Sequence, residues 1–129
     1  RGDYVTDTYT NSVHGVCDMK YYKRAVMEVL KSMEQAHFFI FSDDLDWVRD
    51  NLDFIDNKTF VVLEANIPDH EEMYLMSQCK HNIIANSSFS WWGAWLNQGL
   101  DKKVIAPKKW FEGDALNTND LIPNSWVRL

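Results

Sequence analysis

The sequence predicts an α/β fold, a Rossmann-like parallel sheet with helices on both faces. Four short apolar runs alternate with segments whose apolar residues recur at helical spacing. The runs are apolar at successive positions, which is typical of strands buried on both faces of a sheet. No repeat, linker or low-complexity tract interrupts this pattern, so residues 1–129 are expected to form a single domain.

The first half of the chain predicts two helix–strand pairs. Residues 18–35 are expected to be a helix, because apolar residues repeat every three or four positions and Asp18 precedes them as a cap. The apolar run 37–41 is the first expected strand. Residues 42–52 follow as a helix with acidic residues in its first turn, where the helix dipole favours them. Residues 59–64 are the next expected strand.

The second half repeats the alternation. Residues 69–79 are expected to be a helix that begins after a proline turn, and residues 82–85 a strand. Residues 88–98 form the next expected helix, which is almost wholly apolar. A helix of that composition is usually buried, so its Trp91–Leu96 segment is expected to lie in the core. Residues 103–106 are the last clear strand, and the irregular remainder is expected to hold one short helix or a terminal strand.

Ligands of parallel α/β sheets bind beyond the carboxyl ends of the strands. This rule selects the residues that follow each expected strand, namely 42–44, 64–66, 86–88 and 107–109. The segment 86–90 (NSSFS) is notable because its hydroxyl groups precede a helix. They could simply cap that helix, or they could hold an anion together with its free N–H groups, and the sequence leaves both readings open.

The acidic segment Asp43-Asp44-Leu45-Asp46 contains a D-x-D pattern, which holds a metal-bound sugar nucleotide in some glycosyltransferases. Acids at a helix start need no metal, and we favour that structural reading. The four histidines lack the paired spacing of a zinc site, so no metal site is expected.

The composition of the chain limits which kinds of molecule it can bind and where it can be located. The chain has 13 basic and 19 acidic residues and a formal charge of −6, which argues against a nucleic-acid-binding face but allows a local cationic pocket for a phosphate. Cys17 and Cys79 cannot form a disulfide framework, so a reducing compartment is the simpler reading. No apolar run approaches the ~20 residues that a membrane-spanning helix needs. The chain begins at Arg1 without a Met, and we expect it to be a fragment whose first strand lies upstream.

Several stretches carry a family resemblance. The longest is 73–96 (MYLMSQCKHNIIANSSFSWWGAWL), followed by 104–111 (VIAPKKWF), with shorter blocks at 14–22 and 39–44. Arg1-Gly2-Asp3 looks like the end of an H-x-R-R-x-D motif with Arg1 as its second arginine. Together these stretches resemble the C-terminal half of the α-1,2-fucosyltransferases, glycosyltransferase family 11, and its bacterial members in particular.

The resemblance implies an inverting enzyme that moves L-fucose from GDP-fucose to the 2-hydroxyl of a terminal galactose. It implies a GT-B-like fold whose C-terminal half binds GDP-fucose without a metal or other cofactor. The chain would then be the donor-binding domain of a longer enzyme, inactive without the half that binds the galactose-terminated glycan. Its expected location is the cytoplasm or the inner face of a bacterial membrane.

The resemblance also assigns roles. Arg1 would pair with the diphosphate and stabilise the charge on departing GDP, and Asp3 would orient the arginine pair. Glu72 would accept the N1 and N2 protons of guanine, at a position where many members carry Asp. No residue is a convincing general base, so leaving-group stabilisation would dominate unless the base lies upstream.

The remaining implied contacts surround the donor. The residues expected to hold phosphate oxygens, through hydroxyls and helix N–H groups, are Asn86, Ser87 and Ser88. Asp43 and Phe89 are also expected in the donor site.

Two other classes are weighed against this reading. A receiver-type signalling domain has paired acids after one strand, a hydroxyl after another and a lysine after the last. That set is mimicked here by Asp43, Asp44, Ser87 and Lys108. In a receiver, however, the paired acids lie near the chain start, and the phospho-acceptor position here holds Glu64, a carboxylate of the wrong length. A nucleotide-binding module without transferase activity is the third reading, and it differs only in lacking an acceptor site.

Overall fold

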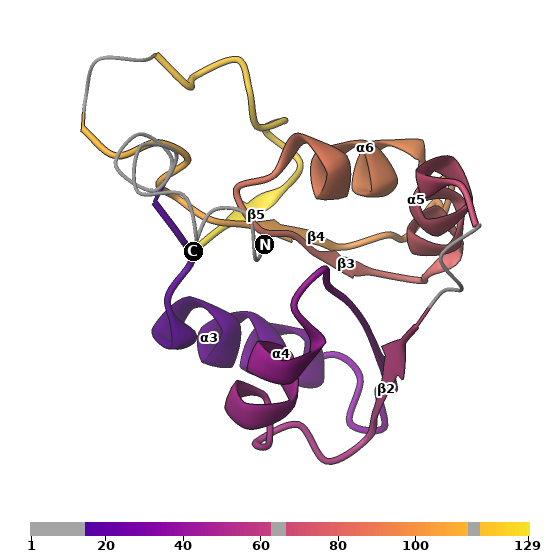
Figure 1. The fold of residues 1–129 in the computed structure, drawn as a ribbon. Helices are drawn as coiled ribbons and strands as arrows, with labels where there is room; N and C mark the ends of the chain where they lie inside the picture. Colours follow the sequence, from indigo (N-terminus) through magenta and orange to yellow (C-terminus); the bar gives the residue numbers. More distant parts are fainter. Residues whose placement is uncertain (1–14, 63–66, 114–116) are drawn as a thin grey trace.

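The structure, a computed structural model, describes residues 15–62, 67–113 and 117–129, and their elements follow the predicted alternation of helices and strands. Helices α5 and α6 lie on one side of strands β3, β4 and β5, and helices α3 and α4 lie on the other (Figure 1). The helices are α3 (Met19–Leu30), α4 (Leu45–Asn51), α5 (Asp69–Gln78) and α6 (Ser88–Leu96). The strands are β1 (Phe38–Phe41), β2 (Lys58–Val61), β3 (Asn82–Ile83), β4 (Val104–Ala106) and β5 (Val127–Arg128).

Every strand pairing in the described residues is parallel, as predicted, and the pairings form two hydrogen-bonded sheets. One sheet pairs β1 with β2, and the other has the order β3-β4-β5. The two sheets meet through side chains, since Phe38 of β1 and Ile83 of β3 pack against the same buried cluster, which includes residues of α3 and Ile105 of β4. The α/β class with helices on both faces is therefore confirmed.

The elements are shorter than the sequence predicted, and local hydrogen bonds explain two of the boundaries. Helix α4 begins at Leu45 rather than at residue 42, because the Asp44 carboxylate accepts the Trp47 N–H at 3.0 Å and so caps the helix. The predicted cap of α3 is confirmed, since the Asp18 carboxylate accepts the Tyr21 N–H at 2.8 Å. The alternative of a terminal strand is also confirmed, as β5.

Strand β4 is buried on both faces and alternates its side chains between two cores. Ile105 packs against α3, in a cluster with Ala25 and Val29. Val104 and Ala106 contribute instead to the cluster that contains Ala94 of α6. Successive side chains of a strand point to opposite faces of the sheet, so β4 contributes to the cores on both of its faces.

The prediction that Trp91–Leu96 lies in the core is wrong for three of its six residues. Trp92 and Trp95 are each 49% exposed, and Leu96 is 45% exposed. The buried residues of α6 are the small ones, Gly93 and Ala94. A Cβ on Gly93 would lie 2.9 Å from the Met76 side chain, so α5 packs too closely on α6 for anything larger. The helix therefore buries its small residues, while Trp91 packs half-buried against the core and Trp92 and Trp95 lie at the surface.

The hydroxyl group of Tyr21 fastens α3 to the carboxyl ends of two strands. It donates to the carbonyl oxygens of Ile84 and Ile105, at 2.6 and 3.1 Å. The Ile105 oxygen also accepts the Ile84 N–H at 2.9 Å, whereas no other donor to the Ile84 oxygen occurs in the described residues. Burial raises the pKa of the Tyr21 hydroxyl, which keeps it protonated as a donor.

We expect Tyr21→Phe to lower the free energy of unfolding by about 1–3 kcal/mol, because it leaves the buried Ile84 carbonyl without a donor. Urea denaturation would measure the change. Tyr74→Phe, at an exposed position of α5, is the matched control and should change stability by less than about 0.5 kcal/mol. Equal effects of the two substitutions would contradict this role for the Tyr21 hydroxyl.

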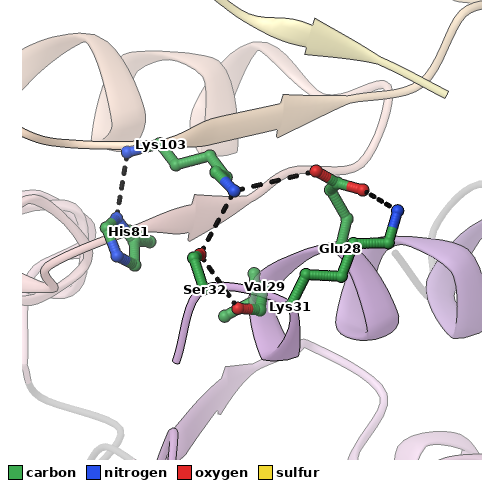
Figure 2. Close-up of polar contacts among 6 residues, drawn as sticks. All are labelled: Glu28, Val29, Lys31, Ser32, His81 and Lys103. Carbon is green, nitrogen blue, oxygen red and sulfur yellow. Dashed lines mark hydrogen bonds and ion pairs between the residues drawn. The ribbon is translucent and has the colours of Figure 1, made fainter. Parts of the chain in front are cut away.

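At the amino ends of β3 and β4, a polar cluster joins the end of α3 to the start of β4 (Figure 2). The Lys103 ammonium lies 3.7 Å from Glu28 and donates to the Ser32 hydroxyl at 3.2 Å. The backbone N–H of Lys103 donates to Nδ1 of His81 at 2.9 Å. Nδ1 can accept only while unprotonated, and burial followed by the charges of Lys80 and Lys103 lowers the pKa of His81.

The lowered pKa of His81 predicts a loss of stability at acid pH. The unfolded chain takes up the histidine proton near pH 6.5, before the folded protein does, so acidification from neutral pH favours unfolding. His81→Asn keeps an acceptor for the Lys103 N–H but cannot titrate, so it should flatten the melting-temperature profile between about pH 7 and 5. Thermal unfolding across this range would measure it. Parallel profiles for the two proteins would show that other groups cause the acid sensitivity.

Candidate functional site

Two cavities lie at carboxyl ends of strands, where the sequence predicted ligand binding. The larger, of about 340 Å³, lies beyond β4 and next to the Asn86 position that follows β3. Its lining residues are Val16, Cys17, Asp18, Tyr21, Arg24, Asn86, Pro107, Lys108, Lys109, Glu112 and Leu129. The smaller, of about 160 Å³, lies at the ends of β1 and β2, and its lining residues are Ser42, Leu45, Val61, Val62 and Glu72. We call them the cationic cavity and the acidic cavity.

The cationic cavity has three walls. One is the exposed edge of α3 with the loop before it, from which Asp18 and Arg24 reach the cavity. The second is the loop after β4, which carries Lys108 and Lys109. The third is the turn between β3 and α6, at Asn86. An anion in this cavity would lie against cationic groups from two separate segments of the chain.

Asn86 braces the wall between β3 and α6. Its side chain is buried, and its amide donates to the carbonyl oxygens of Gly15 and Trp110, both at 3.2 Å. Its own oxygen accepts from the Cys17 thiol at 3.5 Å. Burial raises the pKa of that thiol to about 11, so it remains a donor at neutral pH. Asn86 therefore ties the loop before α3 to the loop after β4.

Gly15 is one end of this brace and has a φ of +63°, a conformation that L side chains rarely adopt. A Cβ at this position would also meet the Glu112 carboxylate at 2.5 Å. Both observations explain why glycine occupies the position.

The three residues after Asn86 start helix α6. Ser87 is buried and is the N-cap residue by position, but its side chain makes no capping hydrogen bond; Ser88 is exposed and Phe89 is half-buried. None of the three lines either cavity. The first reading of this segment, hydroxyl capping of the helix, is thus not what Ser87 does, and a role of these residues in phosphate binding stays a prediction.

Glu72 lines the acidic cavity from the first turns of α5. Partial burial, with further contributions from the charges of Asp69 and Asp43, raises the pKa of the Glu72 carboxyl. Asp43 and Glu72, both predicted for the donor site, therefore influence one another electrostatically. The remaining acids of the D-x-D segment have local structural roles, because Asp44 caps α4 and Asp46 pairs with Arg49 at 3.3 Å.

Three predictions cannot be compared with this geometry. Arg1 and Asp3, and the loop around Glu64, lie outside the described residues. Within the described ranges, no group of three or more His, Cys, Asp or Glu residues is arranged to hold a metal ion.

Sequence reasoning missed Arg24 and the contribution of the segment 16–18. In the sequence, Arg24 is only one polar position of a predicted helix. Its place beside the cavity follows from Tyr21, three residues earlier on the same helix face, whose hydroxyl reaches the carboxyl ends of β3 and β4 in the structure.

Comparison with known proteins identifies the family. The sequence profile described as glycosyl transferase family 11 matches residues 1–129. The chain belongs to glycosyltransferase family 11. The family resemblance predicted from the motifs is thus confirmed, and it leaves a receiver domain without support.

Two bacterial proteins match this chain over its whole length. An O-antigen biosynthesis glycosyltransferase, WbnK, of Escherichia coli is 40% identical over 131 residues, with 42% of its own length covered. An alpha-1,2-colitosyltransferase of the same species is also 40% identical over 131 residues, with 45% of its length covered. Human galactoside alpha-(1,2)-fucosyltransferase 1 is 27% identical over 101 residues, which cover 77% of this chain and 27% of the human protein.

This family 11 chain therefore spans less than half the length of the relatives it matches. No solved structure matches it significantly. Among the helices of the described residues, none is both long enough and apolar enough to cross a membrane.

The brace at Asn86 predicts a large effect of Asn86→Asp on stability. The substitution replaces an amide that donates to two carbonyl oxygens by a group that repels them. We expect the free energy of unfolding to fall by at least about 2 kcal/mol, measured by urea denaturation. Asn119→Asp makes the same chemical change at an exposed position and should be nearly neutral. A similar small change in both variants would show that Asn86 does not brace the site.

Proposed function

We propose that this chain is the donor-binding half of a GT-B-like enzyme that transfers L-fucose from GDP-fucose to the 2-hydroxyl of a terminal galactose. The observation that carries the proposal is the profile match to family 11 over residues 1–129. A cationic cavity at the carboxyl ends of β3 and β4 supports it, because a nucleoside diphosphate sugar carries its negative charge on the two phosphates.

A second donor sugar has specific support. One relative that matches the whole chain at 40% identity is an alpha-1,2-colitosyltransferase, whereas the human fucosyltransferase is 27% identical over a shorter segment. Colitose is fucose without its 3-hydroxyl group. Transfer of colitose from GDP-colitose is therefore the alternative, and it uses the same nucleotide, the same phosphates and the same bond cleavage.

The proposed chemistry depends on the leaving group. As the bond between the sugar and the β-phosphate breaks, negative charge develops on GDP, and Arg1 would meet that charge with two parallel hydrogen bonds. Asp3 would orient Arg1. Ser87 and Ser88 would add hydrogen bonds to phosphate oxygens from the start of α6. A group that meets charge formed only in the transition state lowers the barrier more than it tightens donor binding.

The test is a transfer assay with the 129-residue chain and with a full-length protein that contains it. Lactose serves as the acceptor, and GDP-fucose and GDP-colitose are compared as labelled donors, with EDTA present and absent. We expect transfer only by the full-length protein, unaffected by EDTA, and reduced about a hundredfold or more by Arg1→Ala. Transfer that needs manganese would disprove metal independence, and transfer of neither sugar would disprove the proposed activity.

Base recognition gives the clearest prediction for the chain alone. If Glu72 accepts the N1 and N2 protons of guanine, Glu72→Gln should weaken GDP binding roughly ten- to a hundredfold and UDP binding hardly at all. The same substitution should raise the melting temperature at neutral pH, because it removes a partly buried charge that Asp69 and Asp43 repel.

The stability gain has its own pH dependence. The pKa of Glu72 is raised on folding, so the wild-type protein regains this stability as pH falls and the carboxyl becomes protonated. The difference in melting temperature should therefore shrink at acid pH. Glu71→Gln, at an exposed position in the same turn of α5, is the control for calorimetry and for thermal unfolding. Equal weakening of GDP and UDP by Glu72→Gln would contradict guanine recognition.

A further inference from the structure

The charged groups around the cationic cavity differ in whether they have partners. Lys109 forms an ion pair with Glu112, so these two lining charges compensate one another. The Asp18 carboxylate accepts the Tyr21 N–H at the start of α3, where the helix dipole favours a negative charge. Arg24 and Lys108 are the other charged lining residues. Neither side chain makes an ion pair or a hydrogen bond in the part of the chain that the structure describes.

The backbone at both cationic residues is held in place by contacts with the rest of the fold. Arg24 lies in the middle of α3, between Tyr21, whose hydroxyl bonds to two strand ends, and the fully buried Ala25. Lys108 follows the buried Pro107, and its N–H donates to the carbonyl oxygen of Leu129 at 2.7 Å. These two charges, unpaired among the described residues, thus line one cavity from two separate segments of the chain, an arrangement that an anionic ligand would stabilise.

We propose that Arg24 and Lys108 bind the phosphate groups of the nucleotide-sugar donor, an inference that rests on the function proposed above. The guanidinium of Arg24 can donate two parallel hydrogen bonds to one phosphate, and the ammonium of Lys108 acts as a compact charge toward the other. The cavity volume of about 340 Å³ is sufficient for a diphosphate and part of its attached groups. These contacts are additional to those assigned to Arg1, Ser87 and Ser88.

The inference is tested by calorimetry on the 129-residue chain with pyrophosphate, GDP and guanosine. The variants are Arg24→Gln and Lys108→Met. Lys20→Gln changes the net charge of the same helix by the same amount from an exposed position outside the cavity, and is the matched control. Urea midpoints would confirm that every variant is folded.

We expect Arg24→Gln and Lys108→Met each to weaken pyrophosphate and GDP binding by about tenfold or more, with guanosine binding unchanged. The Lys20→Gln protein should bind all three ligands within about twofold of the wild type. Raising the salt concentration should weaken GDP binding less in either variant than in the wild type, because each variant has lost one cation–phosphate contact.

The outcomes separate this inference from the proposed function. If GDP binds more tightly than pyrophosphate but Arg24→Gln and Lys108→Met behave like Lys20→Gln, the phosphates lie elsewhere and the inference is wrong, while the proposed function stands. If pyrophosphate binding depends on Arg24 and Lys108 but guanine adds no affinity, the anion site is right and the nucleotide-sugar donor is wrong. Failure of both pyrophosphate and GDP to bind would overturn both.

Discussion

The buried amide of Asn86 is the contact on which the candidate site depends. Strands β3 and β4 end at nearly the same level, and the chain leaves them in different directions, toward α6 and toward the C-terminus. Asn86 joins the two departing segments and also holds the loop before α3, through Gly15 and Cys17. Because a buried carbonyl without a donor is costly, this one side chain fixes three walls of a cavity at once.

The charged side chains at the amino ends of β3 and β4 have partners, whereas two of those at the carboxyl ends have none in the described residues. At the amino ends, the Lys103 ammonium contacts Glu28 and Ser32, and its backbone N–H donates to His81. These contacts connect α3 to β4 and stabilise the fold (Figure 2). At the carboxyl ends of the strands, Arg24 and Lys108 have no such partners in the described residues. Two cations left without a partner among the described residues, around one cavity, are consistent with a ligand that supplies the negative charge.

Periodicity predicted the order and type of the elements because both depend on local spacing of apolar residues. It failed for part of α6, where composition predicted burial of the tryptophans: Gly93 lies too close to Met76 of α5 for a side chain, and Trp92 and Trp95 are exposed. The rule for strand ends selected Ser42, Asn86 and Lys108, which line the two cavities, because topology alone fixes that end of the sheet, whereas Glu72 was predicted only from the family resemblance. Arg24 was missed because its role depends on how α3 is anchored, through a Tyr21 hydroxyl contact 63 residues away in sequence.

The two cavities together give a physical basis for one orientation of a nucleotide. Glu72 and Asp43 create a negative potential at the acidic cavity, which repels phosphates but attracts the N–H groups of a guanine edge. Arg24 and Lys108 do the reverse at the cationic cavity. A ligand with a hydrogen-donating base and a diphosphate would therefore be favoured in one direction and opposed in the other. The partial burial of Glu72, together with the charges of Asp69 and Asp43, raises the pKa of its carboxyl at a cost to the folded protein, and a ligand that donates hydrogen bonds to the carboxylate would offset this cost.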